Sequence, residues 1–245
     1  MNDKVTPPLK PRSDLGIRTL SGVAMMSVAI AAIWLGGYTF MGLVIAIGLG
    51  VFFEFTKLVF GFAQSRQAQI LWLLVGLTYV GLACFTLMLF SAPFFGMTPA
   101  IMLIAGVIGT DVGAYFAGRS IGGPKIAPRI SPSKTWSGLF GGMIGAGLMM
   151  VLIQAGIYAF RGGNAGDGDV YLAYGWFRLM LTGAALAVVA QMGDFFESWM
   201  KRRAGVKDSG RLIPGHGGLF DRTDGLIAVA FAAGVIMLFR SGTVG

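Results

Sequence analysis

Long, continuous apolar runs dominate this chain of 245 residues and limit what it can fold into. A helix needs about 20 mostly apolar residues to cross a bilayer. Runs of about that length lie at residues 19–36, 38–60, 69–91, 96–118, 137–160, 174–200 and 219–240. They do not alternate with polar residues, which disfavours a transmembrane β-barrel. Charged residues make up only 12% of the chain, against about 25% in soluble domains. We therefore expect an all-α, polytopic integral membrane protein with about seven transmembrane helices.

The basic residues predict which side of the membrane each loop faces. With seven spans, all but three of the 19 Lys and Arg residues fall on one side, the exceptions being Arg161, Arg178 and Arg240. The positive-inside rule makes this side cytoplasmic, so we expect a cytoplasmic N-terminus and a C-terminus outside. The first run has the basic start of a signal peptide, but the segment before it is long and a second apolar run follows at once. We therefore expect an uncleaved first helix.

The chain divides into three parts by composition. We predict a cytoplasmic segment at 1–18, N-terminal membrane helices at 19–95, and a catalytic membrane domain at 96–240 with cytoplasmic basic loops at 119–136 and 201–218. Glycines and prolines keep the first loop out of regular helix until about Ser137. The single cysteine, Cys84, lies in an apolar run and forms no internal disulfide. The net charge of +8 fits membrane orientation and anionic lipid or nucleotide partners, and we expect no nucleic acid.

Several acidic residues lie within or next to the apolar runs, where burying a carboxylate in the membrane costs free energy. Six of the 11 acidic residues stand within or at the ends of apolar runs, namely Glu54, Asp111, Asp194, Glu197, Asp221 and Asp224. Each costs a few kcal/mol at the centre of a membrane helix. Asp194, Glu197 and Ser198 share one helix face, and Asp221 and Asp224 share another. Such oxygen ligands suit Mg²⁺ with substrate phosphates. The alternative is interhelical ion pairs with Arg202, Arg203 and Arg222.

Two of these carboxylates stand apart from the pairs. Glu54 is either a boundary residue near Lys57 or a structural residue. Asp111 is flanked by glycines and lies two turns before Arg119 on the same helix face.

The two basic loops supply positive charge near the carboxylates. The sequence PGHGG at 214–218 favours exposed backbone N–H groups and leads into a helix start, and both features bind anions. His216 is open to three interpretations: an acid, a donor to phosphate, or a polar turn residue. In the other loop, one interpretation makes Lys125, Arg129 and Lys134 interfacial anchors. In the second interpretation, Ser133 and Lys134 near a helix start bind a lipid phosphate or a nucleotide tail. Paired carboxylates beside these loops predict a site for a metal and a polyphosphate.

A family motif is recognisable in residues 198–224, which read SWMKRRAGVKDSGRLIPGHGGLFDRTD. This stretch resembles the hallmark motif of CDP-diacylglycerol synthases, also called phosphatidate cytidylyltransferases. Its fixed positions are met at Ser198, Lys201, Arg202, Lys207, Asp208, Pro214, His216, Gly217, Gly218, Asp221, Arg222 and Asp224. Residues 111–138 are similar to the family as well, except that Ser137 stands where the family usually has an acidic residue.

The resemblance implies the reaction CTP + phosphatidate → CDP-diacylglycerol + pyrophosphate, dependent on a divalent metal that we expect to be Mg²⁺. It maps the family's metal-binding aspartates onto Asp194 and Asp221, and Glu197 is a further candidate ligand. We assign catalytic roles to Asp194, Asp221, Lys134, Lys201 and Arg222. Substrate-binding roles go to Arg119, Lys125, Ser133, Ser198, Arg202, Lys207, Asp208, His216, Gly217, Gly218 and Asp224.

The expected location is a bacterial-type inner (plasma) membrane, with the site facing the cytoplasm, where CTP meets the lipid phosphate at headgroup depth. The sequence leaves open whether a second metal ion, divalent or monovalent, is bound and whether the protein forms a homodimer. The rival hypotheses are a CTP-dependent polyprenol-type kinase, which would release CDP, and an ion-coupled transporter. A transporter places its charges near the bilayer midplane, whereas here they gather at one face.

Overall fold

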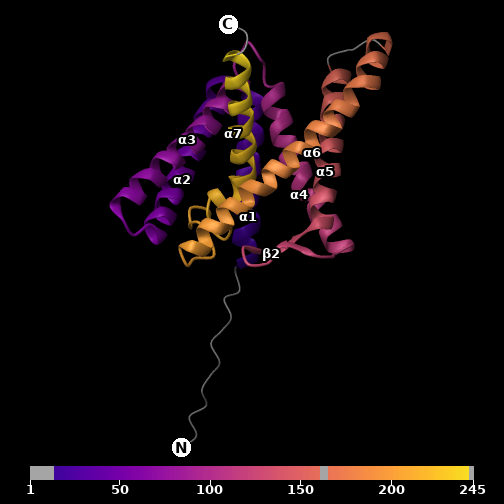
Figure 1. Ribbon diagram of the computed structural model, residues 1–245. Helices are drawn as coiled ribbons and strands as arrows, with labels where there is room; N and C mark the ends of the chain where they lie inside the picture. Colours follow the sequence, from indigo (N-terminus) through magenta and orange to yellow (C-terminus); the bar gives the residue numbers. More distant parts are fainter. Residues whose placement is uncertain (1–13, 161–164, 243–245) are drawn as a thin grey trace, which may run out of the picture.

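The structure, a computed structural model, describes residues 14–160 and 165–242 as seven helices and one small hairpin (Figure 1). The elements are α1 (Asp14–Leu35), α2 (Gly37–Phe62), α3 (Arg66–Phe90), α4 (Thr98–Ser120), β1 (Lys125–Ala127), β2 (Ser131–Thr135), α5 (Trp136–Phe160), α6 (Ala165–Arg203) and α7 (Phe220–Gly242). All seven helices contain a stretch long and apolar enough to cross a membrane. The predicted all-α, polytopic membrane fold is confirmed.

The first basic loop contains structure that the sequence did not predict. β1 and β2 form a two-stranded antiparallel hairpin within the predicted loop 119–136. α5 then begins at Trp136, next to the predicted boundary at Ser137. The side chain of Thr135 accepts a hydrogen bond from Gly138 N at 3.1 Å, which satisfies one of the free N–H groups at the start of the helix.

The second basic loop starts later than predicted. α6 continues through Lys201 and Arg202 to Arg203, because basic side chains are favourable in the last turn of a helix. It ends in a Schellman motif: Val206 N donates to Lys201 O at 2.9 Å, and Gly205 has φ 70°. The predicted loop 201–218 is therefore a loop at residues 204–219, and Lys201 and Arg202 are helical.

The six helices α2 to α7 pack in two groups around separate apolar cores. α2, α3, α7 and the end of α6 bury Phe55, Met200 and Phe220, whereas α4, α5 and α6 enclose Met150 and Leu186. α6 belongs to both groups and crosses the molecule diagonally (Figure 1).

α4 and α5 approach each other through small residues. Each carries two glycines four residues apart, Gly109 and Gly113 on α4 and Gly141 and Gly145 on α5. A Cβ on Gly109 would lie 2.5 Å from the carbonyl oxygen of Gly145. This is the close backbone contact that small residues at this spacing permit between membrane helices, and it fixes Asp111 between two of those glycines.

The basic loops gather at one end of the bundle. The hairpin, the loop 204–219, the C-terminal end of α6 and the start of α7 all lie at the lower end in Figure 1, whereas α7 ends at the top. Charged residues distant in sequence thereby meet on one face.

Candidate active site

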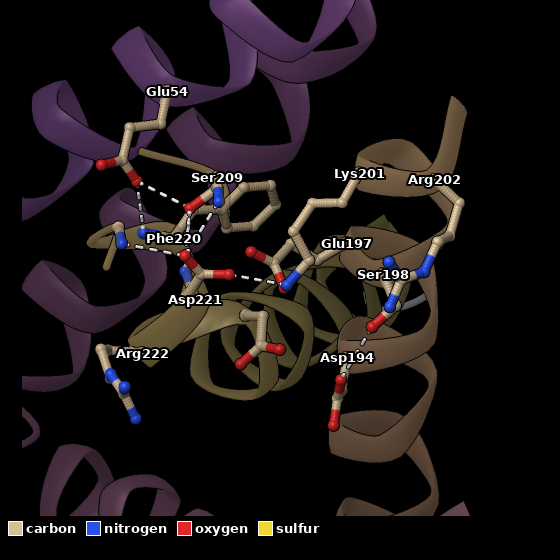
Figure 2. Close-up of polar contacts among 12 residues, drawn as sticks. Glu54, Asp194, Glu197, Ser198, Lys201, Arg202, Ser209, Phe220, Asp221 and Arg222 are labelled. Carbon is tan, nitrogen blue, oxygen red and sulfur yellow. Dashed lines mark hydrogen bonds and ion pairs between the residues drawn. The ribbon is translucent and has the colours of Figure 1, made fainter. Parts of the chain in front are cut away.

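Lys201 joins two helix ends through two carboxylates. Its Nζ lies 2.6 Å from Glu197 Oε2, one turn earlier on α6, and 2.6 Å from Asp221 Oδ1 in the first turn of α7. Figure 2 shows Lys201 and Glu197 directed toward Asp221. The side chain of Glu197 is 1% exposed and that of Lys201 is 13% exposed, so water screens this cluster only weakly.

Asp221 uses its two oxygens differently. Oδ2 accepts hydrogen bonds from the backbone N–H groups of Ser209 and Gly218, each at 2.9 Å. Oδ1 is left for Lys201. The N–H group of Gly218 in the glycine-rich loop thus binds the carboxylate of Asp221, and the predicted contact of this loop with a substrate phosphate stays a prediction.

A second ion pair joins the hairpin to α6. Lys134 Nζ on β2 contacts Asp194 Oδ2, and the Ser198 hydroxyl lies 3.3 Å from Asp194 Oδ1. Both side chains of the ion pair are about one-quarter exposed, 28% for Lys134 and 25% for Asp194, so the pair stands at an opening. The first basic loop therefore supplies Lys134 as a partner for α6, whereas Lys201 belongs to α6 itself, just before the second loop.

The ion-pair alternative expected arginine partners, and the structure gives different ones. Arg202 Nε contacts Ile130 O at 3.5 Å, the Arg203 guanidinium lies 5.4 Å from the centre of the Trp199 ring, and Arg222 donates to His216 O. The carboxylates instead pair with lysines. The expected ion pairs with these arginines are therefore not the ones found among the described residues, where Lys134 pairs with Asp194 and Lys201 pairs with Glu197 and Asp221.

Two adjoining cavities open beside Lys134. The larger, about 330 Å³, is lined by polar groups of both signs, including Arg119, Lys134, Ser133 and Asp111, and is large enough for part of a small-molecule ligand. The smaller, about 30 Å³, is lined by Asp111, Asp194, Asp224, Lys134 and Arg222 among others, and is large enough for at least one water molecule.

The backbones of α6 and α7 meet at this point. A Cβ on Gly193 would lie 2.6 Å from the carbonyl oxygen of Asp224. This contact brings Asp194 and Asp224 to the walls of the same small cavity. Carboxylates from α4, α6 and α7 therefore surround one space.

The donor set fits a hard divalent cation. Carboxylate oxygens are the ligands that Mg²⁺ prefers, and it usually takes one or two of them together with substrate phosphates. Glu197 Oε1 is buried and has no hydrogen-bond partner among the described residues. In the same part of the chain, no three His, Cys, Asp or Glu side chains stand close enough to form a complete metal site, so any such ion would draw its remaining ligands from substrate or water.

Some predicted site residues lie outside this cluster. His216 Nδ1 is 2.8 Å from the Ser21 hydroxyl of α1, so its ring faces that helix. Lys125 Nζ donates to Ser133 O at 3.4 Å within the hairpin. Lys207 and Asp208 are exposed in the loop. Their predicted contacts with substrate stay predictions.

The structure shows the hydrogen-bond partners of two further side chains, Ser137 and Glu54. Ser137, the departure from the family pattern, donates to the carbonyl of Gly122 and closes the hairpin. Glu54, for which the sequence left two interpretations, is wholly buried, and its carboxylate accepts from Ser209 Oγ and Phe220 N. Of the two interpretations the structural one holds, and through Ser209 the residue contacts the loop 204–219, which we call the motif loop. The only signal for it was an acidic residue within an apolar run.

Comparisons with known proteins agree with the motif and extend beyond it. The model of the cytidylyltransferase family matches residues 60–240. The chain is 35% identical, over 269 aligned positions and 93% of each chain, to the phosphatidate cytidylyltransferase of Brucella suis. It is 34% identical over 222 positions to that of Rickettsia bellii, with 90% of each chain covered. A third such protein, from Rickettsia typhi, is 31% identical over 221 positions. The similarity to these relatives therefore reaches into the N-terminal helices.

Proposed function

Because this chain belongs to the cytidylyltransferase family, we propose that it transfers CMP from CTP to phosphatidate, giving CDP-diacylglycerol and pyrophosphate. It is a CTP-using nucleotidyltransferase, and the relatives named phosphatidate cytidylyltransferase supply the lipid substrate for the proposal. The observation that carries it is that two ion pairs, Lys134 with Asp194 and Lys201 with Asp221, lie at one end of a membrane bundle, where Lys134 also lines a polar cavity.

The chemistry needs positioning and charge neutralisation more than proton transfer. A phosphate oxygen of phosphatidate attacks the α-phosphorus of CTP. The bond from that phosphorus to the bridging oxygen of the β-phosphate breaks, and pyrophosphate leaves with its electron pair. A phosphate monoester has a second pKa of about 6, so the nucleophile is already largely dianionic at neutral pH. No general base is required, in agreement with a chain that has one histidine.

Basic side chains hold the two anionic substrates together. Arg119 and Lys134 line the 330 Å³ cavity, where they bind the phosphates of CTP. Arg119 is oriented by Tyr115, whose hydroxyl accepts from its guanidinium at 2.9 Å. Lys201 and Arg222, at the ends of α6 and α7, lie where the lipid phosphate approaches. Such fixed charges stabilise the charge that shifts to the leaving group in phosphoryl transfer.

The carboxylates are the residues that would hold the metal. Asp194 and Asp221 are its proposed ligands, with Glu197 beside them and Asp224 on the wall of the same cavity as Asp194. Bound Mg²⁺ supplies neutralisation of the phosphate oxygens and polarisation of the phosphorus. Lys134 and Lys201, which contact these carboxylates here, keep the acidic groups paired and in position.

The site has to lie where both substrates meet. The lipid phosphate lies at headgroup depth and CTP is dissolved in the cytosol, so we place the charged end of the bundle at the cytoplasmic face. The asymmetry of Lys and Arg supports that orientation. The relatives come from bacteria, which supports a bacterial inner membrane.

A product assay tests this function. Purified protein in detergent is supplied with phosphatidate and CTP, with and without Mg²⁺, and the lipid product and the released phosphate compound are identified. We expect CDP-diacylglycerol and pyrophosphate, formed only with the metal. Release of CDP together with a doubly phosphorylated lipid would instead indicate attack at the γ-phosphorus, as in a CTP-dependent lipid kinase, and would refute the proposal.

A further inference from the structure

Glu54 is a buried carboxylate that the reaction as described does not use. It lies on α2, far in sequence from the motif, and its side chain is 0% exposed. Oε2 accepts from Phe220 N at 2.8 Å and from Ser209 Oγ at 3.0 Å, and no basic side chain is among these described partners. A buried carboxylate without an ion pair is costly. A leucine would fill the same buried space without this cost, so the hydrogen bonds of the Glu54 carboxylate need an explanation of their own.

Those contacts satisfy the start of α7. The first N–H groups of a helix have no partner within the helix. In α7, Phe220 N donates to Glu54, and Asp221 N lies 3.3 Å from Ser209 Oγ, which in turn donates to Glu54. Glu54 and Ser209 together act as an N-cap that comes from outside the helix. The negative charge of Glu54 also faces the positive end of the α7 dipole.

The same network fixes Asp221. The Ser209 hydroxyl is 2.9 Å from Asp221 Oδ2 and 3.0 Å from Glu54 Oε2, but it has one hydrogen to donate. Asp221 Oδ2 already receives two backbone N–H groups, so the hydroxyl hydrogen is best used by Glu54. Figure 2 shows dashed contacts that run from Glu54 through Ser209 to Asp221 and from Asp221 to Lys201.

Two glycines leave room for this arrangement. A Cβ on Gly218 would lie 2.6 Å from Glu54 Oε2, and one on Gly210 would lie 2.5 Å from the carboxyl carbon of Glu54. Both positions are in the motif loop. The loop is therefore shaped around the Glu54 carboxylate, and the contact depends on a residue outside the motif.

We propose that Glu54 is a positioning residue for CMP transfer: with Ser209 it caps α7 and holds Asp221, so that Oδ2 stays on its backbone donors and Oδ1 faces the reacting groups. The inference rests on the proposed function, because it assigns Asp221 to the site of that reaction. Glu54 touches neither substrate and acts through Asp221 alone.

The test compares Glu54→Gln and Ser209→Ala with Thr86→Val. Gln keeps the shape of Glu54 but loses its charge, and Ser209→Ala removes one hydroxyl. Thr86, on α3, is 1% exposed, and within the described part of the chain its hydroxyl donates to Leu82 O of its own helix, so its variant reports what a purely structural loss does. For each folded protein, kcat, the KM for both substrates and the Mg²⁺ concentration for half-maximal activity are measured. Calorimetric titration of CTP in Mg²⁺ gives a readout without turnover.

Residues that orient metal ligands change metal affinity or activity by about 10–100-fold when mutated. We expect Glu54→Gln and Ser209→Ala to raise the half-maximal Mg²⁺ concentration or to lower kcat by about tenfold or more, with KM for phosphatidate within about twofold. The double variant should lose little beyond either single change, because the two side chains act as one cap. Mg²⁺-dependent CTP affinity should fall in parallel, and Thr86→Val should change none of these values.

Wild-type Mg²⁺ dependence, kcat and CTP affinity in folded Glu54→Gln and Ser209→Ala would overturn the inference. If Glu54→Gln is not recovered folded, Ser209→Ala decides by the same criteria. A wild-type protein that makes no CDP-lipid would refute the proposed function instead, and the CTP titrations would still compare the variants. The two failures are therefore distinguishable.

Discussion

Removing the Lys201 ammonium should destabilise the fold as well as stop the reaction. In Lys201→Met, Glu197 and Asp221 lose the cation that lies 2.6 Å from each of them. Glu197 is 1% exposed, so it cannot turn to water. Two carboxylates are left facing each other at the meeting point of α6 and α7.

The expected loss of folding free energy in Lys201→Met follows from these distances. At 2.6 Å and an effective dielectric constant of about 20, each contact has a Coulomb energy of about 6 kcal/mol. The two carboxylate oxygens lie no more than about 5 Å apart, and their repulsion cancels at least about 3 kcal/mol. Desolvation of the ions cancels most of the remainder. Removal of one partner from a buried pair costs about 3–5 kcal/mol, which for a chain of this size lowers Tm by about 6–20 °C.

Thermal unfolding of the purified variants in detergent measures this loss. Lys201→Met with Glu197→Gln should recover more than half of it, because the second change replaces the buried acid that has lost its partner with a neutral group of the same shape. Lys57→Met is the matched control: Lys57 is exposed and lies 4.2 Å from the centre of the Phe53 ring, so its loss should cost under about 1 kcal/mol. A Lys201→Met protein as stable as the wild type, or a double variant no more stable than the single one, would refute the reasoning.

Three further predictions concern turnover, helix packing and nucleotide binding. Asp194→Asn should lower turnover at least 100-fold at unchanged Tm, measured as CDP-lipid formed per folded protein, because it removes a proposed ligand of the metal; near-normal turnover would exclude Asp194 from that role. Gly113→Ala should lower Tm, since its Cβ would meet the carbonyl of Gly141, whereas Gly156→Ala, with open space around it, should keep or raise Tm by its better helix propensity. Equal effects of the two would contradict the close contact of α4 and α5. Arg119→Gln should raise the KM for CTP about tenfold or more and leave the KM for phosphatidate near its wild-type value, as initial rates would show; an unchanged KM for CTP would remove Arg119 from the nucleotide pocket.

The membrane helices could be predicted because their length and composition are set by the bilayer alone. The end of α6 could also have been predicted, because a glycine, Gly205, follows the basic last turn. It adopts the φ of 70° that a Schellman motif needs. The hairpin at 125–135 escaped prediction. Its strands are three and five residues long, and prolines lie within and beside them, so no alternating pattern could emerge.

The pairing of charges depended on contacts that the sequence does not encode locally. The motif placed Asp194 and Asp221 in the site, but it did not show that lysines rather than arginines face them. Lys134 on β2 meets Asp194 on α6, a contact between segments far apart in the sequence. Glu54 meets Ser209 across 155 positions of sequence, and only the packing of α2 against the motif loop reveals it.

Whether the α- or the γ-phosphorus of CTP is transferred to the lipid tests most directly the claim that this protein transfers CMP to phosphatidate. The purified protein is given phosphatidate, Mg²⁺ and CTP labelled either at the α-phosphorus or at the γ-phosphorus. The account predicts that the α-label appears in the lipid and the γ-label in pyrophosphate, and that Asp194→Asn forms neither product. Transfer of the γ-label to the lipid would contradict it.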